Sequence, residues 1–422
     1  MKRIWIWNHD ATRMFSDQAG RHYWFAEKLK ERGYAPVIFC ANINHFTAQA
    51  RQMRETYEID AVNGIPFVFV KTTPYKENGM DRIRNWISFY LGLFRIYRII
   101  EKRLGKPEMI LASSVHPLTM AAGIQIAKKM RIPCICEVRD LWPEAIFCVG
   151  KARKNSLPGK MLQRGEYWIY QNADAMIFTK PGDMDYLREQ GWLLEQGGRI
   201  DIRKCFYINN GICYDRYQEQ IRHDVWKDPD LENGKFHVVY TGSLRKVNNI
   251  GNILAAAELL HSEQDIQFLL FGEGALRKSL EGQAEARGLS NVKFKGYVSR
   301  QYIPYILSRS SVNLLNYAQN LYNWKRGNSS NKMFEYLASG KPVISTVKMG
   351  YDILEQYHCG ITLEACTPEC LAEKIWQIKN MPQTQYRQMG ERAKEAAKEY
   401  DFEKLTDKLE TVIAYAAANR DR

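Results

Sequence analysis

The chain has 422 residues, of which 45% are hydrophobic and 25% charged, and its formal net charge is +13. This length exceeds one ordinary core and predicts two lobes of about 200 residues each. The composition excludes a disordered or repetitive chain. The positive excess lies in residues 1–200, with 30 Lys and Arg against 20 Asp and Glu. It favours an anionic partner such as nucleic acid, acidic lipid or a phosphorylated substrate.

The nine cysteines form no CxxC pair and no zinc-type spacing, so we expect them to be reduced. The N-terminus MKRIWIWNHD lacks the apolar region of a signal peptide, and no run of 18 uncharged apolar residues occurs. We therefore expect a cytoplasmic protein that does not span the membrane.

Short apolar runs alternate with amphipathic helical stretches along the whole chain. In the first half, strands are predicted at residues 4–7, 36–41, 109–113, 133–138, 175–179 and 205–209, with a helix at about 20–32. In the second half, strands are predicted at residues 236–242, 266–274, 292–298, 311–317 and 341–346. This alternation predicts an α/β protein with two doubly wound parallel sheets.

A linker is predicted between the lobes, where residues 208–211 (INNG) favour a turn and residues 224–235 are polar. We place the first lobe at 1–205 and the second at 206–402, with a C-terminal helix at about 403–422 as a candidate to pack back on the first. Ligands of open parallel sheets bind beyond the carboxyl ends of the strands, so both substrates are expected in a cleft between the lobes.

The most informative segment is SSNKMFEYLASGKPVIST, residues 329–346. A polar turn before a short helix places the backbone N–H groups of Ser330, Asn331 and Lys332 at a helix N-terminus, where the helix dipole favours a diphosphate. Glu335 follows about one turn later, and its carboxylate can accept hydrogen bonds from a ribose diol. Taken alone, the pattern fits a capped helix equally well.

NKMFEYLASGKPVI resembles the nucleotide-sugar signature of the retaining family 4 glycosyltransferases, and four more segments match that family in order and spacing. They are NHDATRMFSDQAGRHYWFAEKLKERGY (8–34), RDLWPE (139–144), VVYTGSLRKVNNIGNILAAAELL (238–260) and FLLFGEGALRKSLEGQAEARGLSNVKFKGYV (268–298). RDLWPE is similar to bacterial members that build surface polysaccharides such as O-antigen or capsule. The resemblance implies the GT-B fold, an acceptor-binding first lobe, a second lobe that binds the nucleotide sugar, and transfer with retention.

By position, the resemblance assigns donor nucleotide or diphosphate binding to nine residues: Gly20, Gly242, Arg245, Lys246, Val298, Ser330, Asn331, Lys332 and Glu335. Ser243 replaces an arginine that the family usually has after the glycine, so Arg245 and Lys246 are expected to stabilise the departing diphosphate. By analogy the donor is expected to be a UDP-sugar, and no cofactor is expected. The glycines also fit plain turns between strands and helices.

The family's donor motif normally has two glutamates eight positions apart, and Gly327 stands where the first is expected. Nucleotide binding is unaffected by this difference, but recognition of the donor sugar should change. Asn328 and Lys332 are candidates for part of that role.

Two residues of the first lobe are candidate catalytic groups. His116 follows an apolar strand and precedes Pro117, and the resemblance implies a histidine near the donor phosphate and reacting carbon. Asp140, also at a strand's carboxyl end, is a candidate to orient the acceptor hydroxyl or receive its proton. The alternatives are a structural histidine, and an ion pair of Asp140 with Arg139 or a helix cap. Because the family has no settled protein nucleophile, none is named.

Two Asp-x-Asp triplets, Asp183 to Asp185 and Asp228 to Asp230, are similar to the metal motif of the other glycosyltransferase architecture. Neither directly follows a buried strand, and the GT-B fold does not use this motif. We interpret them as solvated or capping aspartates and predict no metal.

Residues 81–106 carry seven basic residues and five aromatics. On one helix the basic side chains fall within about 80° of arc, with the aromatics largely opposite. The basic face comprises Arg84, Arg95, Arg98, Lys102 and Lys106. This pattern suits an anionic bilayer, and with the family's polyprenyl-diphosphate-linked acceptors it predicts a peripheral enzyme on the inner face of the plasma membrane. A core-facing helix with a solvated basic side is the alternative.

Two other functions fit parts of the sequence. A nucleotide-sugar 2-epimerase shares the fold but has no use for a membrane-facing helix. A nucleic-acid-binding protein fits the charge and the aromatics, but no nucleic-acid motif gathers the basic residues, and it leaves residues 329–346 unexplained. We therefore expect no nucleic-acid partner.

Overall fold

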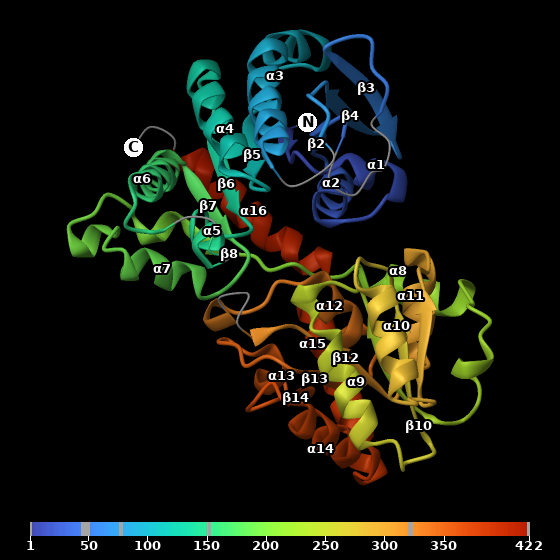
Figure 1. Ribbon diagram of the computed structural model, residues 1–422. Helices are drawn as coiled ribbons and strands as arrows, with labels where there is room; N and C mark the ends of the chain where they lie inside the picture. The colour runs from blue at the N-terminus through green and yellow to red at the C-terminus, as the bar shows by residue number, and fades with distance from the viewer. Residues whose placement is uncertain are drawn as a thin grey trace. The chain divides into compact units, whose positions relative to one another are not determined.

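The computed structural model describes residues 2–43, 51–75, 79–148, 150, 153–319 and 324–419. The chain forms two compact units, Met1–Asn209 with Phe402–Arg422, and Asn210–Asp401 (Figure 1). The boundary predicted after residue 205 falls inside β8 (Cys205–Tyr207), which pairs with β7 (Ala175–Phe178) of the first sheet. The chain therefore leaves the first unit only after Asn209.

The first unit is built on an eight-stranded sheet of order β3-β4-β2-β1-β5-β6-β7-β8. Its other strands are β1 (Arg3–Trp7), β2 (Ala35–Ala41), β3 (Tyr57–Val62), β4 (Ile65–Val70), β5 (Met109–Ser113) and β6 (Cys134–Val138). In this sheet only β3 pairs antiparallel, and all the other pairs are parallel. β1, β2 and β4 to β7 are almost wholly buried, because helices cover both faces.

The β3–β4 hairpin is an addition that the sequence analysis missed. Its two strands are antiparallel, and the turn between them is Asn63-Gly64, with φ of 50° and 71°. Positive φ at both turn residues is the conformation that Asn-Gly favours in a tight hairpin. β3 lies at the sheet edge and is only partly buried, so it lacks the apolar run that identified the other strands.

The helices of the first unit are α1 (Thr12–Asp17), α2 (Arg21–Glu31), α3 (Met80–Leu104), α4 (Pro117–Met130), α5 (Glu144–Cys148), α6 (Leu157–Asn172), α7 (Asp183–Glu189) and α16 (Phe402–Ala418). α4 lies between α3 and α6 (Figure 1): Tyr90 of α3 donates to Gln125, and Lys128 donates to Asn172 of α6. Of the helices that the structure describes, none has the length and apolarity needed to cross a bilayer.

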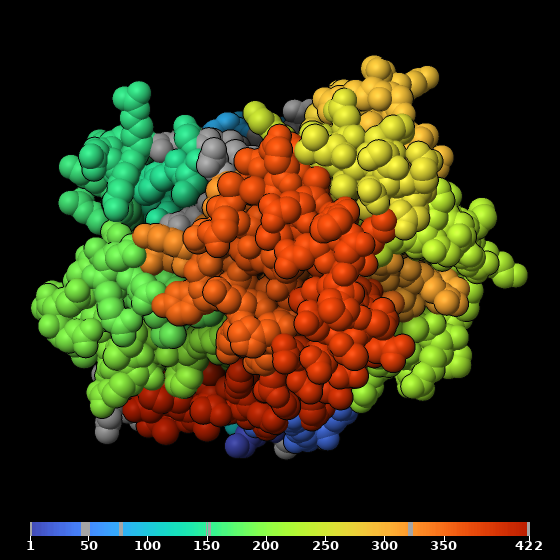
Figure 2. All heavy atoms as spheres, turned by 90° about the horizontal axis from the view of Figure 1, so that it is seen from below, coloured from blue at the N-terminus to red at the C-terminus, as the bar shows by residue number. Residues whose placement is uncertain are grey.

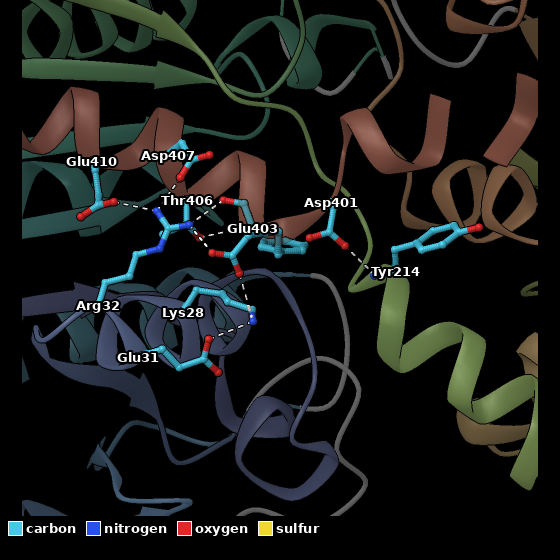
Figure 3. Close-up of polar contacts among 10 residues, drawn as sticks. Lys28, Glu31, Arg32, Tyr214, Asp401, Glu403, Thr406, Asp407 and Glu410 are labelled. Carbon is cyan, nitrogen blue, oxygen red and sulfur yellow. Dashed lines mark hydrogen bonds and ion pairs between the residues drawn. The ribbon is translucent and has the colours of Figure 1, made fainter. Parts of the chain in front are cut away.

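The C-terminal helix α16 packs on α2 (Figure 3). The Arg32 guanidinium of α2 donates to Asp407 and Glu410 at 2.7 and 2.6 Å and also pairs with Glu403. At the start of α16, the Phe402 ring contacts Trp24 and Phe25 of α2, with centroids 4.8 and 5.0 Å apart. Apolar contacts and ion pairs thus join the two ends of the chain within one unit.

The second unit is built on a six-stranded parallel sheet of order β11-β10-β9-β12-β13-β14. Its strands are β9 (Phe236–Thr241), β10 (Ile266–Phe271), β11 (Val292–Gly296), β12 (Val312–Leu315), β13 (Val343–Ser345) and β14 (Gly360–Thr362). All but β14 were predicted. β14 has three half-buried residues, too few to show a pattern.

The helices of the second unit are α8 (Tyr214–His223), α9 (Ile250–Leu259), α10 (Arg277–Ala286), α11 (Ile303–Ser308), α12 (Asn331–Ala338), α13 (Ile353–Gln356), α14 (Pro368–Lys379) and α15 (Gln383–Glu399). Residues late in the second unit, drawn in orange to orange-red, form much of the face in Figure 2. The two ends of the unit are tied together, since Tyr214 N–H donates to Asp401 Oδ2 at 2.6 Å (Figure 3).

In each sheet the strand order reverses at one place, the switch point. The strands that come next along the chain are added to the sheet on opposite sides of it. In the first sheet it lies between β1 and β5, and in the second between β9 and β12. The carboxyl ends of these strands are the places where open parallel sheets bind ligands.

Candidate functional site

The switch point of the second sheet is lined by two glycine loops that touch each other. Gly242 follows β9 with φ 146°, and Gly272 follows β10 with φ 142°. A Cβ atom on Gly272 would lie 1.8 Å from the carbonyl oxygen of Gly242, and one on Gly274 would lie 2.3 Å from that of Leu244. These glycines let one backbone lie directly on the other, so they shape the loop on which the predicted diphosphate site depends.

Gly272→Ala is expected to displace the Gly242 loop, because the new methyl group cannot share space with a backbone oxygen and the φ of 142° strains any L side chain. We expect a loss of about 2–4 kcal/mol in the free energy of unfolding, measured by urea denaturation. Gly282→Ala, on α10 with open space around it, is the matched control. Equal stability of the two variants would contradict this account of the loops.

Lys332 brings a basic group from α12 to the Gly242 loop. Its ammonium lies over the rings of Tyr240 and Tyr317, at 4.8 and 4.5 Å from their centroids, and 3.4 Å from the Tyr240 hydroxyl. A Cβ atom on Gly242 would lie 3.0 Å from Lys332 Nζ. Burial lowers the pKa of Lys332 from 10.5 to about 7, with Glu335 acting against the shift and Arg245 adding to it. A bound diphosphate would restore the charge, so this ammonium is suited to donor binding.

The lowered pKa of Lys332 predicts a pH-dependent stability difference. Between about pH 7 and 10.5 the unfolded chain binds a proton at Lys332 that the folded chain does not, so this group makes stability rise with pH. Lys332→Met, which removes the buried charge, is expected to stabilise the unliganded protein by roughly 1–3 kcal/mol near pH 6.5 and by little near pH 10. Urea unfolding at both pH values tests this; a gain that does not depend on pH would contradict it.

The start of α12 carries the signature residues. Ser330 is the N-cap, and Asn331 and Lys332 begin the first turn, where backbone N–H groups have no acceptor within the helix. The N–H of Ser330, which the sequence analysis assigned to the diphosphate, donates instead to Asn328 Oδ1 at 2.7 Å. The Ser330 hydroxyl is buried and has no hydrogen-bond partner among the described residues. Ser330 therefore has its hydroxyl, rather than its N–H, available for a ligand.

Glu335 lies one turn into α12, and its carboxylate is 3.2 Å from the guanidinium of Arg300. Arg300 follows the predicted base-contacting residue Val298, which is buried beside the exposed Tyr297. The ion pair therefore joins the two segments that the resemblance assigned to base and ribose. Arg300 was not predicted, and its only sequence signal is its place two residues after Val298.

Arg245 and Lys246 are exposed on the loop after Gly242. Arg245 Nε donates to the Ser243 hydroxyl at 2.9 Å, so the residue that replaces the family's arginine now holds Arg245 in place. Both cations lie at the rim of the loop, where they can contact a phosphate without being buried.

Gly327, which stands in place of the expected glutamate, has φ 98°. L side chains rarely adopt this conformation, so the backbone at this position favours glycine. A glutamate at this position would be strained.

In the first unit, His116 is the N-cap of α4 and is fully buried. Its ring stacks on Trp86 with centroids 4.9 Å apart, and the His9 ring meets it edge-on at 5.0 Å. Neither ring nitrogen has a hydrogen-bond partner among the described residues. Burial, followed by the charges of His9 and Arg82, holds its pKa well below the usual 6.5, so the imidazole is neutral. It can offer one donor and one acceptor to a ligand.

The other two predicted residues of the first unit differ in exposure. Asp140 is largely exposed and pairs with Lys180 at 3.1 Å, rather than with Arg139 as the alternative interpretation expected. Gly20 is the N-cap of α2 with φ 114°, a conformation that favours glycine. It lies between α1 and α2, in the connection that leads from β1 to α2.

A buried polar cluster next to Gly20 was missed by the sequence analysis. Glu137 of β6 accepts from Arg21 at 2.7 Å, from His22 at 2.8 Å and from the Ser113 hydroxyl at 2.7 Å. Arg21 also donates to the carbonyl oxygens of residues 208 and 209. A glutamate inside the apolar run PCICEV was the available signal, because a buried charge requires a partner.

The five predicted basic residues, Arg84, Arg95, Arg98, Lys102 and Lys106, are all exposed on or just after α3. The aromatic face packs inward: Phe89 is fully buried, Trp86 stacks on His116, and Tyr90 and Tyr97 pack against the core. These rings complete the core, as expected for the alternative of a core-facing helix with a solvated basic side. Ile83, Ile87, Leu91 and Ile99 are the exposed apolar residues of the helix.

The interpretation of the aspartate triplets as solvated or capping residues holds only in part, since Asp228 caps the short helix Pro229–Leu231 but Asp183 is fully buried. Asp228 and Asp230 both accept from Lys295, at 2.7 and 2.5 Å, and Asp185 pairs with Arg188. Within the described residues, no group of three or more His, Cys, Asp or Glu side chains is placed to hold a metal ion.

Comparisons with known proteins assign each unit. Residues 224–396 match the family Glycosyl transferases group 1, and residues 20–196 match the Glycosyl transferase 4-like domain. The chain is 23% identical over 290 residues to the probable glycosyltransferase WbjE of Pseudomonas aeruginosa, covering 66% of this chain and 68% of that protein. It is 24% identical over 249 residues to the putative colanic acid biosynthesis glycosyl transferase WcaI of Escherichia coli K12, covering 57% and 58%.

Two solved structures resemble the fold over nearly the whole chain. Sucrose-phosphate synthase from Thermosynechococcus elongatus has a TM-score of 0.71 at 17% identity, covering 99% of this chain and 100% of that one. HepE from Anabaena in complex with UDP-glucose has a TM-score of 0.65 at 14% identity, covering 98% and 100%. The chain thus belongs to the glycosyltransferases of the GT-B fold, with a 4-like first unit and a group 1 second unit.

Proposed function

We propose that this glycosyltransferase is a retaining, metal-independent enzyme that transfers a sugar from a nucleotide diphosphate, with UDP favoured, to a polyprenyl-diphosphate-linked glycan during surface polysaccharide synthesis. The proposal that the enzyme binds a nucleotide-sugar donor rests on one observation. The Gly242 loop, Lys332 and Glu335 lie together at the switch point of the second sheet. Support for UDP comes from HepE, which was solved with UDP-glucose, and support for polysaccharide synthesis comes from the name of WcaI.

In this proposal, the N–H groups at the start of α12 and the Lys332 ammonium bind the diphosphate, while Arg245 and Lys246 add charge at the rim. Positive charge at the leaving group stabilises the developing diphosphate as the bond to the sugar breaks. Glu335 accepts hydrogen bonds from the ribose, with Arg300 holding its carboxylate. Asp140 and the neutral His116 are the candidate groups for the acceptor hydroxyl and the reacting carbon.

Three measurements test the reaction. Thermal shift with UDP, GDP and dTDP should identify one base, because a specific ligand stabilises the folded state. Incubation with UDP-sugars and short-chain polyprenyl-diphosphate glycans should give a product whose anomeric configuration, read by NMR, matches that of the donor, with activity unchanged by EDTA. Turnover of donor to its 2-epimer without an acceptor would reject transfer in favour of epimerisation.

The membrane proposal concerns the outer face of α3. Its basic residues alternate with exposed Ile83, Ile87, Leu91 and Ile99. On the other side of α4, α6 exposes Leu157 and Met161 beside Lys160 and Arg164. Cations with apolar residues between them suit the anionic inner face of a plasma membrane, where the lipid-linked acceptor would be located.

Liposome flotation tests this surface. Binding is expected with vesicles containing about 30% phosphatidylglycerol and not with phosphatidylcholine alone, and it should weaken with salt. Replacing Arg84, Arg95 and Arg98 with glutamate should abolish flotation, whereas replacing the exposed Arg387, Arg392 and Lys394 of the second unit should not. Binding that ignores lipid charge would reject the proposal.

A further inference from the structure

The hydrogen bonds around the buried His9 determine where its protons lie. His9 directly follows β1 and Asn8, and its Nε2 lies 2.6 Å from Oδ1 of Asn85 on α3. The Asn85 amide can take only one orientation, because its Nδ2 is 2.5 Å from the backbone carbonyl of Thr73, which can only accept. Asn85 therefore presents its oxygen to the imidazole, and Nε2 of His9 must carry a proton.

The other ring nitrogen faces a carboxylate. Nδ1 of His9 lies 2.6 Å from Oδ1 of Asp10. Burial opposes the charge on Asp10, but the hydrogen bond and charge of His9, together with Arg82 and Arg139, lower its pKa overall. An ionised carboxylate can only accept, so Nδ1 carries a proton as well. His9 is consequently an imidazolium, ion-paired with Asp10.

This imidazolium lies against the ring of His116, whose two nitrogens bond to none of the residues that the structure describes. The centroids of the His9 and His116 rings are 5.0 Å apart, and their planes meet at 74°. The Trp86 ring stacks on His116 at 23° to its plane. The charged groups that face His116 are His9, from the loop after β1, and Arg82, from α3. Both are cations, so a second buried charge on His116 would be repelled by each of them.

We propose that His9 is a positioning residue that, together with burial, keeps His116 uncharged, with one N–H and one lone pair for a reactant. A charged His116 could donate twice but accept nothing, so it could neither receive a proton nor accept a hydrogen bond from a sugar hydroxyl. The kinetic part of this inference rests on the proposed transfer reaction, whereas the protonation states do not.

The protonation states are read from the side-chain nitrogens of protein labelled with [15N]histidine. In the wild type at pH 7.5, one histidine should carry protons on both ring nitrogens, as its two hydrogen bonds require, whereas free histidines are largely neutral above pH 6.5. This signal should be missing in His9→Gln and present in His223→Gln, which changes an exposed histidine of α8. A wild-type spectrum with no persistent imidazolium would overturn the proposal without any variant.

The coupling to His116 is tested in the same spectra and in the pH dependence of transfer. In His9→Gln, the His116 signal, identified by its loss in His116→Gln, should begin to titrate at higher pH, and the acid limb of kcat/KM should move the same way. We expect kcat to fall about tenfold or more with little change in donor KM. An unchanged His116 titration would overturn the proposal. A shifted titration with an unchanged rate profile would instead reject the role of His116 in transfer.

Discussion

Glu335→Ala is expected to lower kcat/KM for the nucleotide-sugar donor by roughly 10- to 150-fold, mainly through KM. The carboxylate is largely buried and held by Arg300 at 3.2 Å, one turn beyond the helix start that carries Lys332. Hydrogen bonds to a charged group contribute about 1.5–3 kcal/mol, which corresponds to that range. The measurement is initial rate against donor concentration, together with the thermal shift produced by saturating UDP.

The variant should fold normally, because the Glu335–Arg300 pair is partly open to water and such pairs contribute about 1 kcal/mol or less. Glu391→Ala, an exposed glutamate of α15 in the same unit, is the matched control and should bind donor like the wild type. Arg300→Ala should produce a smaller rise in KM, since it removes the support of the carboxylate rather than the carboxylate itself. Unchanged donor kinetics in Glu335→Ala would remove the ribose-binding role from this residue.

The architecture followed from the apolar runs because both faces of a parallel sheet are covered. Continuous apolar runs such as MILAS and IQFLLF are stable as strands only where helices cover both of their faces. They form β5 and β10, which are fully buried. The β3–β4 hairpin escaped prediction because its outer strand is half-exposed and mixes Tyr57, Glu58 and Asp60 with apolar residues. Its Asn63-Gly64 turn was the usable signal.

The donor site was predictable only where a single segment carries it. Residues 329–346 contain the helix start and Glu335 together, so the sequence pattern suffices. The rings around Lys332 come from β9 and from the loop after β12, and Arg300 comes from the loop after β11, so no local pattern links them. Likewise, helical periodicity identified two faces of α3 but could not decide which one meets the core.

The conformation at Gly327 illustrates another limit. A sequence shows that a glutamate is replaced by glycine but not that the backbone there has φ 98°. Because this φ strains any L side chain, replacing Gly327 with glutamate should not by itself restore the family's donor contact.

The largest effect on stability is expected from Glu137→Ala. Glu137 is fully buried; burial opposes its charge, but Arg21 and His22 hold its pKa well below the usual range. Removing it leaves the Arg21 guanidinium buried without a counter-charge, which typically costs about 3–5 kcal/mol. Glu137→Gln keeps a hydrogen-bond acceptor and should cost less. Urea unfolding followed by tryptophan fluorescence measures the loss.

A double variant separates the cost of an unpaired charge from the contribution of the pair. Arg21→Met with Glu137→Leu removes both charges, so it should be more stable than Glu137→Ala even though it leaves the carbonyls of Ile208 and Asn209 without their donor. Hydrogen exchange followed by mass spectrometry should show faster exchange in β8 and α2 for both variants, with β10 of the second unit unchanged. A double variant less stable than the single one would mean that the arginine contributes mainly by holding those carbonyls, where the chain leaves the first unit, rather than by balancing the buried carboxylate.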